Sequence, residues 1–168
     1  MLDIAQVETD EQISQLEEIS WEYLSYVNEN VQREYQISFD IRSILAHDMT
    51  SLNIFAPLEG CMYLAQLDGQ TAGMIGLRKN KSNIGELKRM YVRPTFRRKG
   101  IARALVETAL KDAHQIGYTR LRLDSTRFMQ EAHALYRSVG FCEIEPYEGS
   151  EIPKDFQPHW VFMELTFV

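Results

Sequence analysis

The chain has 168 residues, of which 45% are hydrophobic and 25% are charged. This balance is typical of one ordinary soluble globular domain and excludes a disordered segment, a collagen-like repeat and a small disulfide-stapled scaffold. The formal net charge is −6, but residues 78–103 carry ten bases and one acid, whereas residues 1–60 carry twelve acids and two bases. A basic segment in an acidic chain indicates a site for a polyanion, although a solvated basic strand and helix start would give the same composition.

Other features exclude several classes of partner. No apolar run reaches the roughly 18 to 20 residues that span a bilayer, and the stretch MLDIAQVETD has neither the basic start nor the apolar core of a secretory signal. Cys61 and Cys142 are too few and too far apart for a metal motif or a disulfide framework. We therefore expect a cytoplasmic protein with no metal and no membrane partner, and an isoelectric point near 5.3 argues against nucleic acid.

The first half of the chain predicts a strand over residues 2–7 and then two helices. The first helix begins after a capping box formed by Thr9 and Gln12 and runs to about Asn30, and the second covers residues 39–47. An antiparallel hairpin over 61–67 and 71–78 follows, and a further strand over 84–92 ends at Pro94.

In the second half, a helix with a 3.6-residue apolar period begins at Gly100. A strand over 118–124, a helix over 129–139, a strand over 141–144, an irregular stretch over 146–158 and a final strand over 159–168 complete the chain. These elements predict a single α/β domain of the α+β type over residues 1–168, with a mixed central sheet of about six to seven strands flanked by about four helices.

The segment between the strand at 84–92 and the next helix has the features of an anion site. It is short and basic, and it leads through Gly100 into the helix. The first amides of a helix have no internal partner and lie at the positive end of its dipole, so they bind a diphosphate well. Neither the Walker pattern nor the G-x-G-x-x-G pattern is present.

Residues 97–102, Arg-Arg-Lys-Gly-Ile-Ala, match the pattern [QR]-x-x-G-x-[GA] of the GNAT N-acetyltransferase superfamily, and they follow a Tyr-Val-x-Pro strand end. A second block, Ala132-His-Ala-Leu-Tyr-Arg-Ser-Val-Gly-Phe141, resembles the family's A-x-x-L-Y-x-x-x-G-F element. The resemblance covers residues 61–144. Many members carry Asn seven residues before the helix tyrosine, where this chain has Met129.

The resemblance implies an acetyl-CoA-dependent enzyme that transfers the acetyl group to a primary amine by direct attack in a ternary complex. The backbone amides of the turn from Arg98 to Ala102 would bind the pyrophosphate, and pantetheine would pair with the strand edge, where a backbone N–H near Val92 would polarise the thioester carbonyl. The implied cofactor-binding residues are Met90, Tyr91, Val92, Arg97, Arg98, Lys99, Gly100, Ile101, Ala102 and Arg103.

Two residues are candidates for catalysis. Glu86 lies where several family members carry the base that deprotonates the amine, although it also suits a structural ion pair with Lys88 or Arg89. Tyr136 is the family's helix tyrosine, which would protonate the leaving thiolate, although it also suits a core aromatic. The apolar alternation of the strand slips between Leu87 and Met90, which predicts the β-bulge that opens the acetyl slot in this family.

The acceptor is indicated by charge alone. Acids are dense in residues 1–60 and in 143–151, and aromatic side chains accompany them, which favours a small cationic amine. A protein or peptide amine, or a catalytically silent acyl-CoA-binding domain of the same fold, remains an alternative. We expect a monomer or a homodimer.

Overall fold

The computed structural model describes residues 1–52 and 60–168, and within them the chain forms seven strands and four α-helices. The helices are α1 (Asp10–Tyr35), α2 (Ile41–Thr50), α3 (Ile101–Ile116) and α4 (Gln130–Ser138). The strands are β1 (Leu2–Gln6), β2 (Cys61–Leu67), β3 (Gln70–Lys81), β4 (Ile84–Val92), β5 (Arg120–Thr126), β6 (Cys142–Ile144) and β7 (Trp160–Thr166). None of the described helices is both long and apolar enough to cross a bilayer.

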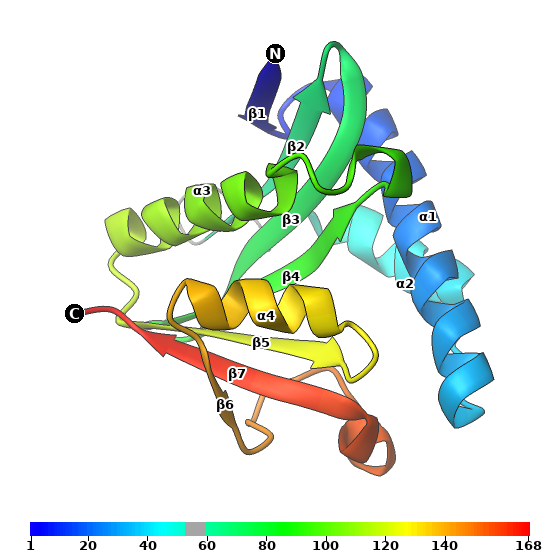
Figure 1. Ribbon diagram of the computed structural model, residues 1–168, viewed down its shortest axis with the longest axis vertical. Coiled ribbons are helices and arrows are strands. Elements are labelled where there is room, and N and C mark those ends of the chain that lie inside the picture. Colours follow the sequence, from blue (N-terminus) through cyan, green and yellow to red (C-terminus); the bar gives the residue numbers. More distant parts are fainter. Residues whose placement is uncertain (53–59) are drawn as a thin grey trace.

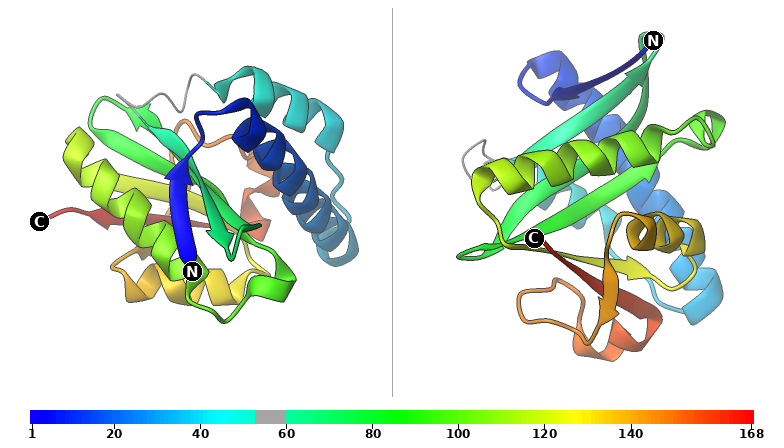
Figure 2. Two further views of the ribbon diagram at one scale, coloured as in Figure 1. Left: turned by 90° about the horizontal axis from the view of Figure 1, so that it is seen from above. Right: turned by 60° about the vertical axis from the view of Figure 1, so that its left-hand side comes forward.

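The strands form one sheet in the order β1-β2-β3-β4-β5-β7-β6, in which only β4 and β5 run parallel. Helices α1 and α2 cover one face, which we call the front face, and α3 and α4 cover the back (Figure 2). The predicted α+β fold, with a mixed sheet of six to seven strands and four helices, is therefore confirmed.

Some element boundaries differ from those predicted. Helix α1 ends at Tyr35 rather than Asn30, because its last turn buries Val31 and because Gln36 ends the helix in the left-handed region at a φ of 59°. Part of the stretch predicted as irregular forms a 3-10 helix over Lys154–His159. The capping box of Thr9 and Gln12 is present as predicted.

The predicted bulge lies in β4. The pairing of β3 with β4 shifts register between Met74 and Gly76, so that the extra residue of β4 falls at Arg89 and Met90. Arg89 has a φ of 57°, a left-handed conformation that an arginine adopts at a cost of about 1–2 kcal/mol. Such a bulge bends the strand and increases its local twist.

Strands β4 and β5 separate immediately before this bulge. Their parallel pairing covers only three residue pairs and ends where Glu86 meets Arg122. Beyond this point the two strands diverge, as Figure 1 shows. The β5 side of β4 from Leu87 onward is thus left without a strand partner.

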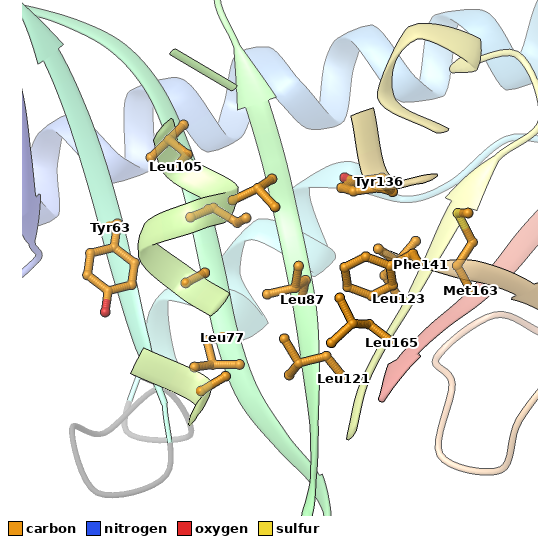
Figure 3. Close-up of a cluster of buried hydrophobic side chains, with 14 of the residues drawn as sticks. Tyr63, Leu77, Leu87, Leu105, Leu121, Leu123, Tyr136, Phe141, Met163 and Leu165 are labelled. Carbon is orange, nitrogen blue, oxygen red and sulfur yellow. The ribbon is translucent and has the colours of Figure 1, made fainter. Parts of the chain in front are cut away.

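The back face holds the largest core, where apolar side chains of α3 pack against β2, β3 and β4. Leu105 and Ala109 of α3 are fully buried there, as the helical period predicts. Figure 3 shows this cluster, of which Tyr136 is a member that lies between β4 and β5.

Candidate functional site

A cleft of about 630 Å³ lies where β4 and β5 have separated. Its walls are the end of β4, the basic loop, the N-termini of α3 and α4, and two tyrosines of α1, Tyr23 and Tyr26. Nine of the ten residues expected to bind the cofactor line it: Met90, Tyr91, Val92, Arg97, Arg98, Gly100, Ile101, Ala102 and Arg103. Lys99 is the exception, and its ammonium lies 5.4 Å from the ring centre of Phe96. The structure therefore gathers the sequence-predicted binding residues in one cavity.

The N-terminus of α3 forms an anion cradle at one end of this cleft. Gly100 precedes the helix at a φ of 79°, and no side chain caps the helix there. Arg98 is also left-handed, with a φ of 61°. Such a turn directs successive backbone N–H groups to one side, and the helix dipole adds positive potential at the same point.

The basic side chains around this cradle have different environments. Arg97 turns inward, donates from Nε to the carbonyl of Val92 at 3.0 Å, and packs over the rings of Tyr26 and Tyr91. It therefore braces the end of β4 as well as adding charge. Arg103 donates to Ser138 at 2.8 Å, which ties the start of α3 to the end of α4.

The free edge of β4 forms the opposite end of the cleft. The amide of Arg93 donates to the carbonyl of Ala72 on β3 at 2.9 Å. Because successive amides of a strand point to opposite sides, the N–H of Val92 points away from β3 and into the opening. The facing wall includes Met129, whose sulfur accepts from the Ser125 hydroxyl at 3.6 Å.

Tyr136 lies between β4 and β5 and is buried in the core rather than among the residues that line the cleft. Its ring packs edge-on against Phe141 at 5.8 Å, and its hydroxyl points toward β4 (Figure 3). Burial raises the pKa of Tyr136 above its ordinary value of 10.0, and the nearby Tyr23 and Asp124 raise it further. The hydroxyl is therefore protonated at neutral pH and is able to donate.

Glu86 is fully buried on the front face. Its Oε1 accepts from Arg78 Nε at 2.7 Å and pairs with Nη2 at 2.6 Å, while Oε2 accepts from the Tyr147 hydroxyl at 2.6 Å. The structural pairing of Glu86 with Lys88 or Arg89, considered from the sequence, is not found, because those two cations have closer carboxylates. Burial and the neighbouring Glu86 carboxylate both raise the pKa of Tyr147.

Lys88 and Arg89 belong to a front-face ion cluster that sequence reasoning missed, formed with Asp48, Asp124 and Glu151. Lys88 lies 3.5 Å from Asp124 across the opening between β4 and β5, and 2.9 Å from Glu151. Arg89 pairs in two-pronged fashion with Asp48 and also lies 2.6 Å from Glu151. The feature of the sequence that could have indicated this cluster is the predicted bulge, which places Arg89 at the opening between β4 and β5.

The acids that predicted a cationic acceptor are in large part already paired. Glu18 and Glu22 of α1 both hold Arg93, each at 2.7 Å. Asp48 and Glu151 belong to the front-face ion cluster, and further acids have local partners: Glu34 with Arg33, Asp40 at the start of α2, and Glu148 with Lys81. These pairs reduce the unbalanced negative charge but do not cancel it, because Glu18 and Glu22 share one arginine and residues 1–60 carry twelve acids against two bases.

The histidines do not contribute to the cleft lining. His133 is buried, and its Nε2 lies 3.0 Å from the Ser125 hydroxyl. Within the part of the chain that the structure describes, no three His, Cys, Asp or Glu side chains are placed to hold a metal ion.

Comparisons with known proteins agree with this geometry. The model of the acetyltransferase (GNAT) family matches residues 13–141. An uncharacterized N-acetyltransferase YjgM of Escherichia coli is 36% identical over 86 residues, which are 49% of this chain and 52% of that protein. Human N-acetylaspartate synthetase is 34% identical over 131 residues, 76% of this chain and 42% of that protein. The chain thus spans about half or less of these relatives' lengths.

Solved structures give the same fold. An acetyltransferase of the GNAT family from Staphylococcus aureus superposes with a TM-score of 0.74 at 18% identity over 99% of both chains. The paia N-acetyltransferase of Thermoplasma acidophilum, solved in complex with coenzyme A, gives a TM-score of 0.74 at 20% identity, again over 99% of both.

Proposed function

The chain belongs to the acetyltransferase (GNAT) family, and on that premise we propose that it transfers the acetyl group of acetyl-CoA to a primary amine by direct attack in a ternary complex. The observation that carries the proposal is one cleft that joins an uncapped helix N-terminus to a free strand edge. A diphosphate fits the helix N-terminus, and the amide groups of a pantetheine arm fit the strand edge.

In the proposed complex, the pyrophosphate accepts from backbone amides between Arg98 and Ala102. Arg98 and Arg103 add charge at the nucleotide end, with Lys99 at its margin. Pantetheine lies along Met90, Tyr91 and Val92 as an added strand. The N–H of Val92, which points into the opening, donates to the thioester oxygen and stabilises the negative charge that develops there.

The reaction then needs a neutral amine. An alkylamine with a pKa of about 10.4 is mostly protonated at pH 7, and its deprotonation costs roughly 4.6 kcal/mol. We propose that Glu86 accepts this proton through the Tyr147 hydroxyl, which donates to Glu86 at 2.6 Å and has a lone pair for the amine N–H. Arg78 holds the carboxylate in place.

Collapse of the tetrahedral intermediate completes the transfer. The new bond joins the amine nitrogen to the acetyl carbon, and the carbon–sulfur bond breaks with its electron pair going to sulfur. Tyr136 is proposed to give its hydroxyl proton to the thiolate, since its raised pKa keeps the proton in place until then. The nitrogen carries two protons after the attack and loses one of them as the amide forms, and this proton replaces the one that Tyr136 has given.

The test is acetyl-CoA-dependent thiol release with pools of amino acids, polyamines, aminoglycosides, arylamines and short peptides, with mass spectrometry of the product. Stoichiometric release of coenzyme A and one acetylated amine is the expected result. Transfer to polyamines would show that the acceptor is a small cationic amine, and transfer only to peptides would show that it is a protein or peptide amine. Tight acetyl-CoA binding without release in any pool would identify a silent acyl-CoA-binding domain and refute the proposal.

A further inference from the structure

Two buried cations, which are not part of the cleft lining, directly precede the wall that β4 contributes to the cleft. Lys88 and Arg89 are consecutive in β4 and immediately precede Met90, which lines the cleft. The Lys88 side chain is only 5% exposed and that of Arg89 only 13%. Tyr23 lies between the two regions, because it lines the cleft and because its pKa, which burial raises, is lowered in turn by the charges of Arg89 and Lys88.

A buried cation requires a carboxylate partner, because an unpaired buried charge costs several kcal/mol. Burial alone would lower the pKa of Lys88, but Asp124 and Glu151 raise it above its ordinary value of 10.5, so the ammonium keeps its charge. Glu151 is shared, since one of its oxygens lies 2.9 Å from Lys88 Nζ and 2.6 Å from Arg89 Nη1. Because one carboxylate oxygen contacts both side chains, Lys88 and Arg89 together form a single carboxylate-binding position.

Glu151 differs from the other members of the front-face ion cluster in how it is held. Its side chain is 38% exposed, the highest value in the cluster. It lies on the connection between β6 and β7, two residues after Gly149, which has a φ of 89°. Its immediate neighbours Ser150 and Ile152 are partly buried, whereas Glu148 and Pro153 in the same connection are exposed. A carboxylate that reaches the cations from an exposed turn is one that another carboxylate can replace.

The charges around this position fit a zwitterion. Asp124 is 6% exposed and holds Lys88 at 3.5 Å, while its other contacts are the hydroxyls of Tyr147 at 3.5 Å and Ser150 at 3.2 Å. If the carboxylate of an acceptor replaced that of Glu151, an ammonium group a few bonds away in the same acceptor molecule would lie beside Asp124 and Tyr147. The proposed proton path begins at this point. Asp124 is also close to the side where the thiolate would leave, because its charge adds to the effect of burial in raising the pKa of Tyr136.

We propose that Lys88 and Arg89 form the acceptor's carboxylate-binding site, that Glu151 occupies it in the free protein, and that the acceptor is an amino acid or a similar amine bearing a carboxylate. The inference rests on the acetyltransferase function proposed above and names the substrate class of that same site.

The first test needs no variant. Thiol release is measured with matched pairs of acceptors, each an L-amino acid and its carboxamide, which differ only in the carboxylate. The acids are expected to have a kcat/KM at least tenfold higher than their amides. Equal or better turnover of the amides, or of polyamines, would overturn this inference while leaving the acetyltransferase function intact. Absence of transfer to every amine would instead refute the function itself.

The second test uses Glu151→Gln, which removes the competing charge from an exposed turn. The acceptor KM is expected to fall about threefold or more for amino acids and to stay unchanged for their amides, with acetyl-CoA affinity unaffected. A rise in KM for both members of each pair would show that Glu151 binds the acceptor itself and would contradict the replacement.

The third test removes the cation. Arg89→Gln is combined with Asp48→Asn so that no buried carboxylate loses its partner, and Arg33→Gln, in an exposed pair on α1, is the matched control. The double variant is expected to lose at least tenfold in preference for acid over amide. An unchanged preference in a folded double variant would show that Arg89 only ties α2 to β4.

Discussion

Replacing Gly100 with alanine tests the anion cradle, because its effect on acetyl-CoA binding can be compared with its effect on the stability of the helix. Gly100 has a φ of 79°, and a Cβ built on it meets nothing within 4 Å. The cost to the free protein therefore comes from backbone strain, about 1–2 kcal/mol for a residue with a side chain in this region. For a chain of this size we expect the melting temperature to fall by roughly 2–8 °C.

Gly117 provides a matched control, because it caps the C-terminal end of the same helix. It has a φ of 99°, and its Cβ would also meet nothing within 4 Å. Gly117→Ala should thus lower the melting temperature by a similar amount. It lies outside the cleft, so acetyl-CoA binding should not change.

The assay is isothermal titration of both variants with acetyl-CoA, alongside thermal unfolding. A methyl group in the cradle keeps the pyrophosphate from the backbone amides, so Gly100→Ala should raise Kd about tenfold, or roughly 1.4 kcal/mol. Wild-type affinity in Gly100→Ala, or an equal loss in Gly117→Ala, would refute the assignment of the pyrophosphate to this turn.

Three further outcomes are expected. Tyr136→Phe should lower kcat about 10²-fold with near-normal acetyl-CoA binding by titration, and undiminished turnover would show that the residue only packs. Glu86→Gln and Tyr147→Phe should both lower kcat/KM at neutral pH and lose less at high pH, where the amine is already neutral; losses independent of pH would remove the relay. Burial, and to a smaller extent the charge of Arg137, lowers the pKa of His133 below 6.5. The contribution of neutral His133 to stability is therefore present above pH 6.5 and is lost as the pH falls below it. His133→Gln should therefore weaken the dependence of the urea midpoint on pH below 6.5, and an unchanged dependence would contradict this.

The gathering of the predicted cofactor-binding residues in one cleft could be expected from the sequence because the features that place them are local. Pro94, the basic loop and Gly100 lie within one strand-to-helix turn, and backbone amides rather than distant side chains form the cradle. The bulge could be predicted for the same reason, since a slip in alternation is visible within one strand.

The environment of Glu86 and the front-face ion cluster could not be predicted in this way. Tyr147 and Glu151 come from the connection between β6 and β7, which has no periodic pattern, and Asp48 comes from α2. Charge counting predicted an acidic entrance without regard to pairing across the fold. Glu18 and Glu22, for example, share Arg93, more than seventy residues away in sequence, which offsets one of their two charges.

The most direct test of this account is a crystal structure of the chain with coenzyme A. We predict pyrophosphate oxygens within hydrogen-bond distance of the backbone amides between Arg98 and Ala102, and a pantetheine arm alongside Met90, Tyr91 and Val92. Coenzyme A bound elsewhere, or bound in this cleft without contact to those amides, would contradict the account.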